Sequence, residues 1–258
     1  MKVIILAGGW GSRLGQQTEL IPKPMVQIGS MPILWHIMKI YSHYNINDFI
    51  LSCGVKANII KDFFINYDYY VNDFTVDLNR NLFQSHSSTK KENWNVTLAN
   101  TGLNTLKGAR IKRVEEYIVD DVNMITYGDG LSNVDINKLL KFHYSHGKIL
   151  TITGVTPPAR FGELITKDGK LISFNEKPQL SSGMINGGFM VFNRELLDYL
   201  SHDESCDFEY GIIEKLTDEG NVMVYEHSGE WACMDHERDV IHLNELWNDN
   251  KAFWKIWK

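Results

Sequence analysis

The sequence has little of what marks several large classes of protein. It contains only three cysteines in 258 residues, Cys53, Cys206 and Cys233, and no two of them form a CxxC pair. An odd set of separate thiols is typical of a reducing compartment and argues against a disulfide framework. Apolar runs such as Val3 to Ala7 are far shorter than the roughly 18 residues of a membrane span. We therefore expect a cytoplasmic protein with structural thiols and no membrane partner.

The sequence also has no excess of basic residues over acidic ones. Lysine and arginine contribute 26 positive charges against 32 acidic residues, so the formal net charge at pH 7 is −6. An acidic surface disfavours general binding to nucleic acid or anionic membranes, although a local basic pocket can still bind a charged small molecule. Hydrophobic residues make up 43% of the chain, and 258 residues can bury a sizeable core. These features indicate a folded globular protein with no nucleic-acid partner.

Strand and helix patterns alternate along the first half of the chain. Val3 to Ala7 is a β-branched run that ends at two glycines, which predicts a buried central strand leading into a glycine loop. A helical pattern follows Pro32. Later patterns predict strands at 49–51, 123–127 and 150–155, and helices at 194–200, 210–217 and 237–247. Their order predicts an α/β fold with a mixed, mostly parallel central sheet flanked by helices, and no linker divides the chain.

The segment GGWGSR at residues 8–13 is a glycine-rich turn directly after the first strand. Backbone N–H groups in such a turn can approach and hold a phosphate or the edge of a base. The segment lacks the Lys-Ser/Thr ending of a Walker loop, and Leu14 stands where a dinucleotide-binding fingerprint needs a small residue. Both of those familiar nucleotide sites are therefore disfavoured, and an ordinary strand-ending turn is the simpler alternative.

Four charged residues are candidates for a site around this loop. Arg13 adds a guanidinium to the loop, and Lys23 stands between two prolines that display it on a stiff, extended segment. Asp129 lies between two glycines at a predicted strand end, and Asp235 follows an apolar segment that could bring it to the same place. Two carboxylates, substrate phosphates and waters suffice to bind Mg²⁺. Taken singly, a solvated lysine and capping aspartates are the simpler interpretations.

Two later segments could bind a phosphorylated polyhydroxyl compound. Glu176 and Lys177 follow a predicted strand in FNEKP, and Asn186 and Gly187 precede another strand in INGGF. Carboxylate and amide groups bind hydroxyls well, and a lysine binds phosphate. A surface ion pair and a turn explain each segment equally well on its own.

Taken in order, GGWGSR, IPKPM, GDG, FNEKP and INGGF resemble the sugar-1-phosphate nucleotidylyltransferase family over essentially the whole chain. The resemblance implies one GT-A-like (Rossmann-like) nucleotidyltransferase domain over residues 1–258 that forms a homo-oligomer. Residues 1–130 would bind the nucleotide, and residues 131–258 would bind the sugar phosphate and other subunits. Flanking segments such as TYGDGLSNVDI are most similar to the cytidylyltransferase members. Those members convert CTP and α-D-glucose 1-phosphate into CDP-glucose and pyrophosphate, which feeds surface polysaccharide synthesis.

The resemblance also assigns roles to particular positions. Mg²⁺ would bind Asp129 and Asp235, while Arg13 and Lys23 would neutralise the leaving pyrophosphate. Lys177 would orient the attacking phosphate, with Glu176, Asn186 and Gly187 beside it at the sugar phosphate. The implied nucleotide-binding positions are Leu6, Ala7, Gly8, Gly9, Trp10, Gly11, Ser12, Arg13, Lys23, Thr105, Arg110 and Gly128.

Several alternatives stay open at this stage. The chain has Trp10 and Ser12 where the family pattern has Leu and Thr, and it departs from that pattern at 211–213, 232–233 and 236–237. A cytidylyltransferase for another phosphorylated acceptor, an enzyme that uses UTP or dTTP, and a non-catalytic nucleotide-sugar sensor are the alternatives. A Rossmann-type binding module is disfavoured by the broken glycine fingerprint.

Overall fold

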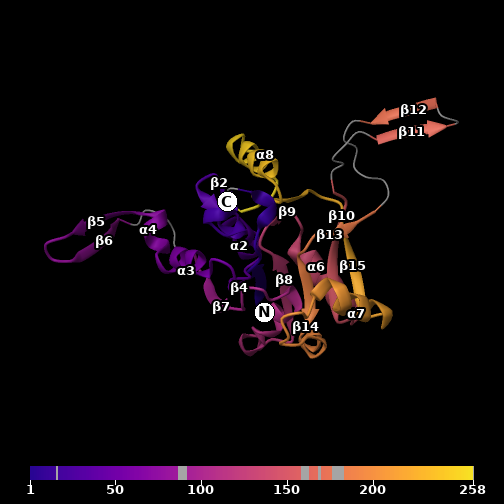
Figure 1. Cartoon of the computed structure of the whole chain (residues 1–258), viewed down its shortest axis with the longest axis horizontal. Coiled ribbons are helices and arrows are strands. Elements are labelled where there is room, and N and C mark those ends of the chain that lie inside the picture. The colour runs from indigo at the N-terminus through magenta and orange to yellow at the C-terminus, as the bar shows by residue number, and fades with distance from the viewer. Residues whose placement is uncertain (16, 87–91, 158–162, 168–169, 176–182, 258) are drawn as a thin grey trace.

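A mixed β-sheet forms the centre of the molecule in a computed structural model that describes residues 1–15, 17–86, 92–157, 163–167, 170–175 and 183–257 (Figure 1). Among these residues, eight strands form the main sheet: β1 (Val3–Ala7), β4 (Asp48–Cys53), β7 (Asn95–Asn100), β8 (Val122–Tyr127), β10 (Leu150–Val155), β13 (Ile185–Asn186), β14 (Met190–Asn193) and β15 (Val222–His227). Strands β7, β4, β1 and β8 lie side by side and parallel. Strand β14 runs antiparallel between β8 and β10, and β15 pairs in parallel with β10.

Strand β1 lies in the middle of the parallel part, as its sequence predicts. Val3 and Ile5 face one hydrophobic core and Ile4 faces the other, and all three side chains are fully buried. A strand with parallel neighbours on both sides and helices on both faces has no side that meets water. The unbroken apolar run is the direct consequence of that position.

Helices cover both faces of the sheet. Those described are α1 (Gln17–Leu20), α2 (Ile33–His43), α3 (Ala57–Ile65), α4 (Tyr67–Val71), α5 (Lys107–Lys112), α6 (Ile136–His146), α7 (Glu214–Asp218) and α8 (Glu237–Asn248). Apolar residues of α2, α3, α6 and α8 pack against the side of Val3, and those of α5 and α7 pack against the side of Ile4. The expected α/β fold with a mixed, mostly parallel sheet is thus confirmed. Among the described helices, none has the length and apolar character needed to cross a membrane.

The described residues also form four short strand pairs outside the main sheet. They are β2 (Gln27–Ile28) with β3 (Met31–Pro32), β5 (Asp73–Asp77) with β6 (Leu82–His86), β9 (Gly130–Ser132) with β16 (Trp231–Cys233), and β11 (Glu163–Lys167) with β12 (Lys170–Asn175). Figure 1 shows the β5–β6 hairpin projecting from the body beyond α3 and α4. The pair β9–β16 instead lies in the body and takes part in the candidate site.

Two predicted helices differ in detail from the structure. The segment at 194–200 forms a 3₁₀ turn, η4 (Arg194–Tyr199), and the segment at 210–217 is not one continuous helix. Gly211 interrupts it with φ 105° and ψ −53°, so a wide turn η5 (Phe208–Ile213) precedes α7. The side chain of Asp207 accepts hydrogen bonds from the N–H groups of Glu209 and Tyr210, which fixes this turn. A φ of this sign suits glycine and breaks the helical backbone.

The aromatic C-terminal tail docks on the body. Trp254 is fully buried, and its indole N–H donates to Nδ1 of His36 at 3.3 Å. Nε2 of His36 lies 2.9 Å from the carbonyl oxygen of Ile28. Because that carbonyl only accepts and the indole only donates, the imidazole is neutral with its proton on Nε2. Burial lowers the pKa of His36 to about 4.

This histidine is expected to make the fold sensitive to acid. Its pKa is about 4 when folded and 6.5 in the reference state, so the unfolded chain binds the proton more readily. Its contribution to stability is complete above the higher pKa and is lost as pH falls through this interval. At pH 5 the loss amounts to about 2 kcal/mol. Urea unfolding at pH 7.5 and 5 should show that His36→Gln is destabilising at pH 7.5 and that its difference from wild type shrinks at pH 5.

The matched control is His202→Gln, because His202 is exposed. That variant should track the wild-type free energy of unfolding at both pH values. If the difference in free energy of unfolding between His36→Gln and wild type is the same at both pH values, His36 is not the buried neutral group described above.

Candidate active site

The carboxyl ends of neighbouring parallel strands meet at one edge of the sheet and border a cavity of about 430 Å³. Strand β1 leads into the glycine loop there, and β8 leads into Gly128 and Asp129. Of the sequence-predicted residues, the cavity is lined by Leu6, Ala7, Gly8, Gly9, Trp10, Gly11, Lys23, Thr105, Arg110, Gly128 and Asp129. Ligands of open α/β sheets bind in the crevice at this edge. The fold therefore gathers most of the predicted nucleotide-binding residues around one opening.

The glycine loop packs closer to its neighbours than residues with a Cβ atom in its place could. A Cβ atom on Gly8 would collide with the guanidinium of Arg110 and lie 3.0 Å from the backbone nitrogen of Gly54. Gly11 has φ +65°, and a Cβ there would lie 3.2 Å from the Cβ of Lys23. Trp10 is 62% exposed at the rim of the cavity. The loop thus leaves its backbone open to a ligand while holding Lys23 and Arg110 close by.

Arg110 and Thr105 belong to the wall of the cavity beside the loop. The guanidinium of Arg110 is almost fully buried and donates to Thr101 Oγ1 and to the carbonyl of Gly102, each at 2.8 Å. Burial and the nearby Arg113 lower its pKa from the usual value. Thr105 Oγ1 accepts a hydrogen bond from Arg113 at 2.9 Å. Both residues therefore fix the 101–105 segment and place a positive charge behind the cavity.

Lys23 joins the two carboxylates that the sequence suggests as metal ligands. Its ammonium lies 2.5 Å from Asp129 Oδ2 and 2.6 Å from Asp235 Oδ1. Burial opposes the charge of Lys23, but Asp129 and the hydrogen bonds to both carboxylates outweigh it and raise the pKa. The lysine is therefore protonated at neutral pH and compensates part of the negative charge of the pair.

Strand pairing explains how residues 106 positions apart along the chain come together. Strand β16 runs antiparallel to β9 with Cys233 opposite Gly130, and the N–H of Met234 donates to the carbonyl of Asp129 at 2.9 Å. Asp235 follows at once, just before α8. Its N–H donates to the carboxylate of Asp239 in the first turn of that helix. This capping contact fixes the backbone that carries the second carboxylate.

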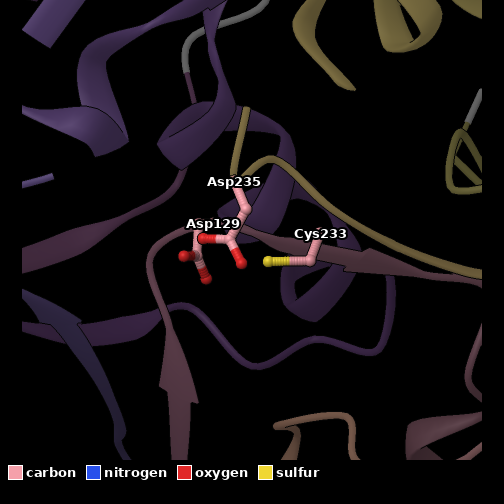
Figure 2. Close-up of side chains that lie close together, drawn as sticks. All are labelled: Asp129, Cys233 and Asp235. Carbon is pink, nitrogen blue, oxygen red and sulfur yellow. The ribbon is translucent and has the colours of Figure 1, made fainter. Parts of the chain in front are cut away.

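The donor atoms at this point suit a divalent cation. Figure 2 shows Asp129 and Asp235 turned toward each other, with the sulfur of Cys233 directed at the pair. One ligand atom from each of these three residues lies within 4.8 Å of the others. Burial first, and then Asp129, raises the pKa of the Cys233 thiol. Two carboxylates that already hold a cation between them fit the magnesium ligands expected from the sequence.

A polar network beside Asp129 was not predicted from the sequence. Tyr127 donates its hydroxyl proton to Glu209 Oε1 at 2.7 Å, and Asn186 donates its amide to the Tyr127 oxygen at 2.9 Å. Lys107 forms an ion pair with the same oxygen of Glu209. Tyr127 and Lys107 line the cavity, whereas Glu209 Oε2 is buried and has no hydrogen-bond partner among the described residues. Burial and the Glu209 charge raise the pKa of Tyr127, which keeps the phenol protonated.

Other candidate residues lie at the margins of the site. Gly187 is adjacent to the network, and its carbonyl accepts from the indole of Trp231 at 2.9 Å. Ser12 begins the 3₁₀ turn η1 (Ser12–Leu14) and is exposed without lining the cavity. Glu176 and Lys177 lie outside the described residues, and so does the side chain of Arg13. Their roles stay predictions.

The arrangement defines an α/β protein whose candidate site lies at the carboxyl edge of its parallel strands. The chain belongs to the nucleotidyl transferase family, whose model matches residues 2–255. It is 45% identical to the glucose-1-phosphate cytidylyltransferase of Salmonella typhimurium, over the full length of both chains. It is 39% identical to the probable glucose-1-phosphate cytidylyltransferase of Bacillus subtilis, also over both full lengths.

A solved structure has the same fold as this chain. The crystal structure of HddC from Yersinia pseudotuberculosis matches with a TM-score of 0.68 and 25% identity, over 95% of this chain and 99% of that one. The chain is thus an enzyme-family member along its whole length, and the prediction of a nucleotidyltransferase is confirmed.

Proposed function

We propose that the chain transfers the cytidylyl group of CTP to α-D-glucose 1-phosphate and releases pyrophosphate and CDP-glucose. The observation that carries the proposal is the full-length similarity at 45% identity to an enzyme of that name. The cavity supports it, because glycine backbone, the cationic side chains of Lys23, Lys107 and Arg110, and the carboxylate of Asp129 line one opening. The second carboxylate, Asp235, contacts Lys23 beside it. Such an opening suits a triphosphate on one side and a second phosphate on the other.

The proposed reaction needs no general base. A phosphate oxygen of the sugar phosphate is already ionised at neutral pH and attacks the α-phosphorus of CTP in line. The new P–O bond forms as the bond to the bridging oxygen of pyrophosphate breaks, so positioning and charge neutralisation do most of the work. This agrees with a cavity lined by no histidine and no cysteine among the described residues.

Each charged residue then has a distinct role. Asp129 and Asp235 hold Mg²⁺, which supplies charge neutralisation and a template for the phosphates when it is bound. Lys23 exchanges its two carboxylate partners for phosphate oxygens, and Arg13 acts beside it on the leaving group. The long side chain of Lys23 makes that exchange possible without a change of backbone.

The acceptor is placed on the side of the cavity nearest Tyr127. Asn186 and Gly187 lie there, and Tyr127, Glu209 and Lys107 form a hydrogen-bonded wall in which the side chains of Tyr127 and Lys107 line the cavity. We assign Glu176 and Lys177 to the sugar and its phosphate. In this arrangement residues 1–130 bind mainly the nucleotide and residues 131–258 mainly the acceptor.

The test is pyrophosphate release with Mg²⁺, with CTP, UTP, dTTP, ATP and GTP each combined with a panel of sugar 1-phosphates. The highest kcat/KM is expected for CTP with glucose 1-phosphate. Turnover of CTP with another acceptor only would move the proposal to a different sugar phosphate. Best turnover with UTP or dTTP would overturn the base assignment, and no turnover with any pair would favour the non-catalytic sensor.

We also infer a cytoplasmic homo-oligomer that serves surface polysaccharide synthesis. The projecting β5–β6 hairpin supports self-association through residues 73–86 rather than through the expected half at 131–258, because Phe74, Val76, Leu82 and Phe83 on it are each more than 40% exposed. Exposed apolar side chains gathered on one element are typical of protein interfaces. Sedimentation should give a particle several times heavier than 29.7 kDa; a monomer at micromolar concentration would contradict the inference.

A further inference from the structure

The sulfur of Cys233 gives the carboxylate pair a third donor of a different chemical kind. This thiol lies on β16, two residues before Asp235, and it shares the 4.8 Å cluster with both carboxylates. Figure 2 shows its sulfur directed toward them. Cys233 belongs to segment 232–233, one of those in which the sequence departs from the family pattern it resembles.

A cation already lies between the two carboxylates of this cluster. The ammonium of Lys23 lies within hydrogen-bond distance of both carboxylates, and its side chain is only 13% exposed. The cluster therefore stabilises positive charge away from bulk water. Zinc–sulfur bonds of about 2.3 Å and zinc–oxygen bonds of about 2.1 Å place the two donors at most about 4.4 Å apart. Small side-chain movements bring the three donors to such distances when the metal ion displaces the Lys23 ammonium from the two carboxylates.

We propose that Asp129, Cys233 and Asp235 form a three-ligand site that takes a thiophilic divalent cation of the Zn²⁺ class in competition with Mg²⁺. The proposal rests on the carboxylate pair that the proposed function assigns to Mg²⁺. Magnesium takes oxygen ligands and leaves the sulfur out, whereas zinc and cobalt accept thiolate. Binding of such a cation releases the thiol proton to solvent and forms one metal–sulfur bond. The chain thereby acquires a site whose occupancy depends on which metal is available.

The probe is Co²⁺ added alone to the full chain, because a cobalt–thiolate bond gives a near-ultraviolet charge-transfer band. We expect the band to saturate at one Co²⁺ per chain and to disappear when one equivalent of Zn²⁺ is added. The variant Cys233→Ser should lose the band, and the matched control Cys206→Ser should keep it. Asp129→Asn and Asp235→Asn should each weaken Co²⁺ binding by at least about tenfold.

Two results would overturn the proposal. One is an undiminished band in Cys233→Ser, which would place the bound metal on another cysteine. The other is a band that needs Cys233 but has the same Co²⁺ affinity in both aspartate variants, which would show that the thiol binds without the pair. The spectrum requires no turnover, so failure of the CTP panel leaves this test intact, and loss of the band leaves the CTP panel unaffected.

Discussion

Asp129→Asn should lower kcat at saturating Mg²⁺ by about 10³-fold. The change keeps the size of the side chain but removes one of the two charges that hold the cation, and Lys23 loses a partner at 2.5 Å. Metal stabilisation of transition-state charge is worth several kcal/mol, and each 1.4 kcal/mol corresponds to about tenfold in rate. Steady-state pyrophosphate release over a range of Mg²⁺ concentrations measures the effect.

The control for this variant is Asp218→Asn at the exposed end of α7, which should keep the wild-type rate. Circular dichroism should show both variants folded. Full turnover of Asp129→Asn at saturating Mg²⁺ would remove Asp129 from the metal site. The expected pattern is a loss of turnover together with a weaker apparent affinity for Mg²⁺.

Trp254→Ala should have the largest effect on stability, a loss of about 3 to 5 kcal/mol in the free energy of unfolding. Trp254 is fully buried, stacks against Trp247 with ring centroids 6.5 Å apart and donates to His36. Its removal leaves a large cavity between the tail, α2 and α8, and it also leaves Nδ1 of His36 without its donor. Urea unfolding at pH 7.5 measures the difference from wild type.

Trp10→Ala is the matched control, because the same truncation is made at a side chain that is 62% exposed. Its free energy of unfolding should stay within about 0.5 kcal/mol of wild type. A loss below 1 kcal/mol for Trp254→Ala would mean that the tail docks only weakly on the body.

Periodicity and composition determined much of the fold before the structure was considered. The run from Val3 to Ala7 indicated a strand buried on both faces, the pattern after Pro32 gave the start of α2, and the pattern at 237–247 gave α8 within one residue. Local rules worked there because hydrophobic spacing and capping act within a few residues. They failed at 210–217, where Gly211 could equally be tolerated within a helix and its φ of 105° depends on the surrounding packing.

The residues of the candidate site also divide into those marked by a local sequence signal and those that only the packing brings together. Glycine loop, Lys23 and Asp129 each stand next to a local signal, a strand end or a proline pair, and so the sequence alone could nominate them. Tyr127 directly precedes Gly128 at a predicted strand end, a signal that was present but not used. Lys107 and Glu209 are 102 residues apart and carry no pattern of their own, so only folding reveals their ion pair.

By itself the sequence determined the class of fold and the family, and it nominated residues for phosphate and metal binding. The tertiary structure decided which of them touch. The pairing of β16 with β9 sets Asp235 and Cys233 beside Asp129, and Lys23 closes the group. Strand register across more than 100 residues depends on the packing of the whole sheet rather than on the spacing of neighbours in the chain. A thiol that composition alone assigned to structure therefore became a candidate metal ligand only through its place in the fold.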